Sequence, residues 1–138
     1  MAIENPSNEK VKQVLQESKN LAVVGLSDNP NRTSYQVSKI MQDKGYHIIP
    51  VNPMVDEVLG QKSYASLKDV DEPIDIINVF RRSEYLPAIA EEAAGTKANV
   101  FWAQLGIENE EAYAYLKDRD FTVIMDTCIK VAHSMLIK

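Results

Sequence analysis

A glycine, hydroxyl residues and an arginine follow the first apolar run at a spacing suited to phosphate binding. The run Leu21–Val24 ends at Gly25, and Ser27 and Arg32-Thr33-Ser34 precede a stretch with apolar residues at helical spacing, namely Val37, Ile40 and Met41. The first amides of a helix lack intrahelical partners, and the macrodipole is positive there, so this helix start attracts an anion such as pyrophosphate. These residues predict a nucleotide-binding turn between a strand and a helix.

Each residue of this turn has a binding interpretation and a structural one. Gly25 lets the backbone approach a phosphate closely, or it simply permits a tight turn. Ser27, Thr33 and Ser34 offer hydroxyl or amide donors. Arg32 is either a solvated surface charge or a phosphate contact, because an arginine at a helix start opposes the macrodipole unless an anion is bound.

The sequence argues against NAD as the nucleotide. No second or third glycine follows Gly25 at the spacing of the dinucleotide fingerprint. The second strand, Tyr46–Val51, ends in Asn52-Pro53, where an NAD site would place an acidic residue for the ribose hydroxyls. A nucleotide other than NAD is therefore expected.

Several short segments, taken in order, closely resemble a known family, the small free-standing coenzyme A-binding proteins of the Rossmann type. The resemblance extends from about Val11 to Leu136. That family is itself similar to the coenzyme A-binding domain of succinyl-CoA synthetase and of the ADP-forming acyl-CoA synthetases. The segments that carry it are 23–27, 32–34, 50–53, 58–60, 78–81 and 102–106.

The resemblance implies a ligand and places residues around it. It implies coenzyme A or an acyl-CoA, with Val51, Asn52 and Pro53 near the adenosine end and the segment Gln104-Leu105-Gly106 at the pantetheine arm. The synthetases pass a phosphoryl group through a histidine outside this domain and need a nucleotide-binding domain as well. We therefore expect a carrier, sensor or regulatory module without catalysis. The alternatives are an NAD(P)-dependent oxidoreductase with a degenerate fingerprint and an interaction subunit that has lost its ligand.

Five apolar runs separated by helical patterns predict an α/β domain with a mainly parallel, doubly wound Rossmann-like sheet and helices on both faces. We expect strand order 3-2-1-4-5 and a leading helix capped by Asn5-Pro6. The expected strands are 21–24, 46–51, 75–80, 98–104 and 121–125; the expected later helices are 83–94, 108–119 and 129–136, with one helical turn near Leu67.

Ligands of such sheets bind at the carboxyl ends of the strands, near the point where the strand order reverses. This rule selects 25–34, 51–53, 80–82 and 104–106, and so adds Phe80 and Arg81 to the candidate cofactor-binding residues. Of Arg81 and Arg82, we expect one to meet a phosphate, with Arg81 the candidate, and the other to face solvent or pair with Glu84.

Composition fits one domain over residues 1–138, since 138 residues with 45% hydrophobic content can form a single core. The net charge of −5 disfavours nucleic acid and anionic membranes as partners. The single cysteine, the start of the chain and the lack of a long apolar run predict a cytoplasmic protein. For protein partners, the alternatives are a homodimer and an unidentified protein.

The remaining reactive side chains do not form a catalytic or metal site in the sequence. Cys128 and His133 are five apart, which turns them away from each other on a helix, so a buried, inert thiol is expected. Thr127 occupies a position where the resemblance favours a basic residue, so one ligand contact is in doubt there. His47 is expected to be packed or hydrogen-bonded, because two isolated histidines make no metal site.

Overall fold

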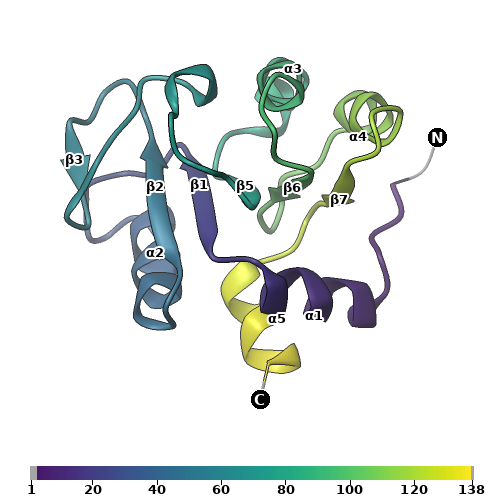
Figure 1. Cartoon of the computed structure of the whole chain (residues 1–138), viewed down its shortest axis with the longest axis horizontal. Helices are drawn as coiled ribbons and strands as arrows, with labels where there is room; N and C mark the ends of the chain where they lie inside the picture. The colour runs from purple at the N-terminus through teal and green to yellow at the C-terminus, as the bar shows by residue number, and fades with distance from the viewer. Residues whose placement is uncertain (1–2, 138) are drawn as a thin grey trace.

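The computed structural model of the protein describes residues 3–137, so residues 1, 2 and 138 of the predicted domain lie outside the described part. It contains a five-stranded parallel sheet, which confirms the predicted α/β class. The sheet has the order β2-β1-β5-β6-β7 (Figure 1), with β1 at Asn20–Val24, β2 at His47–Val51, β5 at Ile76–Val79, β6 at Val100–Ala103 and β7 at Thr122–Ile124.

Helices cover both faces of this sheet (Figure 1). On one face lie α1, α2 and α5, and on the other lie α3 and α4. Along β1, Leu21 and Val23 pack towards the first group, whereas Ala22 and Val24 pack towards the second. The helices are α1 at Asn8–Glu17, α2 at Thr33–Asp43, α3 at Leu86–Ala94, α4 at Glu110–Lys117 and α5 at Ile129–Leu136.

The predicted strand order 3-2-1-4-5 is wrong. Counted in the order of the five predicted strands, the observed order is 2-1-3-4-5, because β1 pairs with both β2 and β5. Pro50 explains why β2 is at the edge: it lacks an N–H, and its carbonyl accepts from the Tyr64 amide (3.0 Å) rather than from a full strand. The strand order therefore reverses between β1 and β5, and the ligand crevice is expected there.

The first helix begins later than predicted. Ser7, not Asn5, is the N-cap of α1, and its hydroxyl accepts from the Lys10 amide at 3.2 Å. Asn5 is used elsewhere, because its side chain donates to the Met125 carbonyl (2.8 Å) and accepts from the Met125 amide (2.9 Å). This pair fixes the beginning of the described chain beside the end of β7.

Between β2 and β5 the sequence predicts one helical turn, near Leu67. The turn is present as the 3₁₀ helix η1, Leu67–Asp69, but a small antiparallel hairpin of β3, Glu57–Val58, and β4, Gln61–Lys62, was missed. Strands of two residues leave no alternation to recognise.

None of the helices within residues 3–137 combines the length and the hydropathy that a membrane span requires.

Candidate functional site

Gly25 ends β1 and brings two chain segments into close contact. Its φ is +86°, a left-handed conformation that favours glycine, and its amide donates to the Val51 carbonyl at 2.9 Å. A Cβ at this position would lie 2.6 Å from the Phe80 carbonyl oxygen. The backbone conformation and the close Phe80 contact alone therefore explain a glycine at position 25. A contact between Gly25 and a ligand stays a prediction.

The start of α2 offers free donors beside this turn. The first intrahelical bond runs from the Gln36 amide to the Arg32 carbonyl (3.1 Å), so the amides of Thr33 and Ser34 precede the hydrogen-bonded turns. The Ser34 hydroxyl is buried and accepts from the Ser27 amide at 3.0 Å, which ties the turn to the helix.

Arg32 is the N-cap residue of α2, and its side chain does not cap the helix. The guanidinium is exposed and makes no hydrogen bond or ion pair within the described chain. Its positive charge at a helix start, unbalanced by a nearby carboxylate contact, leaves this end of the sheet suited to an anion.

The end of β2 is joined firmly to the β1 turn. Val51 is buried, whereas Pro53 is exposed. The Asn52 side chain donates to the Leu26 carbonyl (2.9 Å) and accepts from the Met54 amide (2.9 Å). Asn52 thus holds the two turns together, and it occupies the position at which an NAD site would carry an acid.

Two cavities lie along this carboxyl edge, and Arg81 lines both of them. The first, of about 270 Å³, is mainly apolar and lies between the ends of β1 and β2 and the helix α3; it is lined by Val24, Val51, Pro53, Leu67, Tyr85, Ile89, Glu92 and others. The second, a shallow and widely open depression of about 380 Å³, lies between the ends of β5 and β6 and is lined by Phe80, Arg82, Ser83, Gly106 and Ile107.

The two arginines after β5 have different surroundings, and the expected pairing of Arg82 with Glu84 is confirmed. Arg82 lies 4.0 Å from Glu84 in an exposed ion pair, whereas the Arg81 guanidinium stacks over the Tyr85 ring at 4.8 Å. A stacked guanidinium retains in-plane N–H donors, which suit a phosphate. Arg81 is therefore held between the two cavities with its charge uncompensated by any carboxylate ion pair in the described chain.

The three residues after β6 have different environments. Gln104 is buried: its amide group donates to the Asn78 side chain, and its Oε1 accepts from the Ile129 amide (3.1 Å) at the start of α5. Leu105 is 72% exposed, and Gly106 has a φ of +81° with its amide donating to Asp126 (2.6 Å). Gln104 serves the core, so only Leu105 and Gly106 present free surface to a ligand.

A third hollow, which we call the α1–α5 groove, continues from Leu105. It has a volume of about 350 Å³ and lies between α1 and α5 at the ends of β6 and β7, lined by Val11, Leu105, Asp126, Cys128, Val131 and Met135 among others. Cys128 is half-buried rather than fully buried as expected, and its thiol is free. The His133 ring instead packs edge-on against Tyr46 at 5.7 Å, away from a Cys–His pair.

Thr127, the position where one ligand contact was in doubt, makes hydrogen bonds within the fold. Its hydroxyl donates to the Met125 carbonyl (2.9 Å), and its carbonyl accepts from the Trp102 indole (2.8 Å). No group of three metal-binding side chains occurs in the part of the chain that the structure describes.

The sequence did not reveal that α3 and η1 form one wall of the first cavity. Glu92 accepts from the Leu67 amide at 3.2 Å and so joins α3 to this wall. Tyr85 and Ile89 lie four apart, as residues on one helix face do, but nothing in that spacing separates a cavity wall from an ordinary core face.

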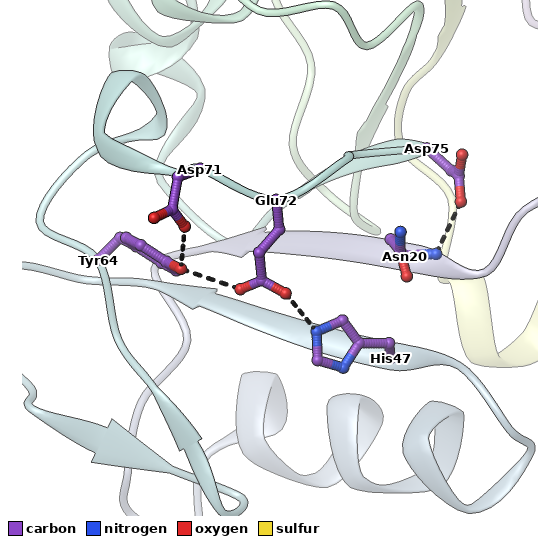
Figure 2. Close-up of polar contacts among 6 residues, drawn as sticks. All are labelled: Asn20, His47, Tyr64, Asp71, Glu72 and Asp75. Atoms are coloured by element: carbon purple, nitrogen blue, oxygen red, sulfur yellow. Dashed lines mark hydrogen bonds and ion pairs between the residues drawn. The ribbon is translucent and has the colours of Figure 1, made fainter.

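A polar cluster holds the segment after this wall against the edge strand (Figure 2). The Tyr64 hydroxyl lies 2.8 Å from Asp71 and 3.0 Å from Glu72, and Glu72 also meets His47 at 2.8 Å. The hydrogen bond to Asp71 and the weaker effects of burial and Glu72 raise the pKa of Tyr64, so the phenol stays protonated. His47 is thus hydrogen-bonded, as predicted.

Comparisons with known proteins identify relatives of this chain. The chain is 63% identical over 133 residues to the uncharacterized protein YneT of Bacillus subtilis, covering 96% of this chain and 98% of that one. It is 32% identical over 74 residues to the ADP-forming acetate–CoA ligase of Methanocaldococcus jannaschii, covering 54% of this chain but 10% of the ligase. The solved structure of cell-free ID.343 from Thermus thermophilus superposes with a TM-score of 0.92 at 31% identity, covering 96% of this chain and all of that one.

The family comparison covers most of the domain. Residues 19–134 match the family described as "CoA binding domain", a span that runs from the start of β1 into α5 and includes all five strands of the sheet. The chain therefore belongs to the coenzyme A-binding domain family.

Proposed function

We propose that the protein binds coenzyme A, or an acyl-CoA, along the carboxyl edge of the sheet. The observation that carries this proposal is the position of Arg81, which lines two neighbouring cavities on either side of the β1/β5 reversal. Sites for whole small molecules span roughly 300–1,000 Å³; the first cavity, at about 270 Å³, is below this range and the second, at about 380 Å³, is near its lower end. A ligand with two different ends fits the pair better.

The first cavity suits the nucleotide end. Its walls are mainly apolar, Tyr85 offers an aromatic face, and the predicted residues Val51 and Pro53 line its β2 side, with Asn52 between them in the chain. The pyrophosphate then falls near Arg81, the β1 turn with Gly25 and Ser27, and the start of α2 with Arg32, Thr33 and Ser34.

The second cavity suits the pantetheine arm. It begins at Phe80 and Arg81 and ends at Gly106, next to Leu105. Gln104 contributes by holding the β6 end in place through Asn78 and the α5 amide.

We propose a non-catalytic role, as a carrier, sensor or regulatory module in the cytoplasm. The two groups most able to do chemistry here, Cys128 and His133, point to different neighbours. The comparisons give no support to the oxidoreductase alternative. Such an enzyme would bind the ribose hydroxyls with an acidic residue at position 52, whereas the Asn52 side chain donates to the Leu26 carbonyl.

Thermal unfolding with added ligands tests this function. A ligand that binds only the native state raises the melting temperature by mass action, so coenzyme A should raise it, whereas NAD and NADP at the same concentration should not. Equal shifts from NAD and coenzyme A would favour the oxidoreductase instead. If none of the three compounds raised the melting temperature, the proposal that the protein binds a nucleotide would be wrong.

A further inference from the structure

Three hollows follow one another along the carboxyl edge in the order of the strands. The first lies at the ends of β2 and β1, the second at the ends of β5 and β6, and the α1–α5 groove at the ends of β6 and β7. Arg81 joins the first two. Adjacent residues join the second to the third, because Gly106 lines one and Leu105 lines the other.

Asp126 fixes this second junction. It lines the α1–α5 groove, and its carboxylate accepts from the Gly106 amide at 2.6 Å. A ligand whose far end reaches Gly106 therefore ends within one residue of the groove. The proposed function puts the thiol end of coenzyme A at this place.

The groove is apolar where it leaves this junction. Leu105 is 72% exposed, Met135 66% and Val131 46%, and all three line it. Three large exposed apolar side chains around one hollow are unusual for a surface that meets only water. The carboxylate of Asp126 belongs to its rim, where the Gly106 amide already satisfies one oxygen.

We propose that the α1–α5 groove is an acyl-binding site, which holds the hydrocarbon chain of a medium-chain acyl group attached to coenzyme A. This inference rests on the proposed function, since the groove opens where the thioester would lie. An acyl chain suits the groove because the groove walls are mainly apolar and because the groove adjoins the proposed coenzyme A site at Leu105 and Gly106. A second copy of the protein is the competing occupant.

Calorimetric titration with three ligands tests this site: coenzyme A, acetyl-CoA and octanoyl-CoA. Full burial of one methylene is worth about 0.8 kcal/mol, or roughly fourfold in affinity, and an open groove gives only part of this for each carbon. Octanoyl-CoA should bind roughly tenfold or more tightly than coenzyme A. Acetyl-CoA, too short to enter the groove, should bind about as coenzyme A does.

Charged substitutions in the groove test whether the acyl chain binds there. Met135→Glu and Val131→Glu should each remove the advantage of octanoyl-CoA and leave the affinity for coenzyme A within about twofold. The matched control is Ile40→Glu, which adds the same charge to an exposed apolar position on α2 that does not line the groove. It should keep the advantage, and melting curves should confirm that all three variants fold.

Three results would overturn the acyl site. Equal affinities for octanoyl-CoA and coenzyme A in the wild type would do so, as would an advantage that survives both groove substitutions. A dimer in sedimentation that Met135→Glu dissociates would assign the groove to a second copy. Failure of the proposed function would differ from all three, because coenzyme A itself would then give no binding heat.

Discussion

Gly25 and Phe80 approach so closely that a side chain on the glycine would meet the backbone of the neighbouring strand end. A Cβ at Gly25 would lie 2.6 Å from the Phe80 carbonyl oxygen and 2.9 Å from the Arg81 Cδ. The glycine thus sets the spacing between the β1 turn and the segment that carries Arg81. Both sides of the β1/β5 crevice depend on this contact.

We expect Gly25→Ala to destabilise the unliganded protein by about 2–5 kcal/mol, since it adds a left-handed alanine and a backbone clash. Denaturant unfolding without ligand measures this. Gly106→Ala is the matched control: its φ is also positive, but a Cβ there meets nothing within 4 Å, so only about 1–2 kcal/mol should be lost. Equal losses would show that the Phe80 contact adds no cost.

Arg32→Ala should separate binding from stability. The side chain has no partner in residues 3–137 and sits at the positive end of α2, so the unliganded stability should change by less than about 0.5 kcal/mol. Coenzyme A binding should weaken by about 1.5–3 kcal/mol, the scale of a hydrogen bond to a charged group. Calorimetric titration and an unliganded melt measure the two quantities.

Lys39→Ala is the control for that experiment, because it removes the same charge from an exposed position in the same helix. Its affinity for coenzyme A should match the wild type. If Arg32→Ala bound normally but melted markedly lower, Arg32 would be structural.

His133 should make the fold sensitive to mild acid. Burial, and secondly the charge of Lys44, lower the pKa of His133 below its ordinary value, although its place in the last turn of α5 favours the charged form. Because the folded pKa is depressed, the unfolded chain binds more protons, and the free energy of unfolding should fall as the pH drops through about 6.5.

Urea unfolding at pH 7.5 and 5.5 measures this effect, with His133→Gln as the comparison. The variant should lose less stability than the wild type over this interval. The same pH dependence in both proteins would show that His133 is not the group responsible.

The sequence predicted the strands well and their order poorly, for a physical reason. Strands covered on both faces appear as continuous apolar runs, so all five were located to within two residues at each end. The same uniformity hides which runs are neighbours. Pro50 was the available signal, because a proline in a strand indicates an edge.

The site was predictable where it depends on strand ends and not where it depends on packing. The segments at Gly25, Val51, Phe80 and Gly106 follow from parallel strands that end at one edge. The buried role of Gln104 and the cavity wall at Glu92 could not be predicted, because each requires a contact between elements 25 residues apart in the chain.

Whether coenzyme A crosses between the two cavities at Arg81 can be measured by calorimetric titration of coenzyme A into the wild type, Arg81→Ala and Arg82→Ala. Arg81 lines both cavities, whereas Arg82 lines only the second and pairs with Glu84 at the surface. We predict that Arg81→Ala weakens coenzyme A binding by about 1.5–3 kcal/mol, ten- to a hundredfold or more, and that Arg82→Ala changes it less than about threefold. Unchanged binding by a folded Arg81→Ala protein would contradict a ligand that crosses from one cavity to the other at this residue.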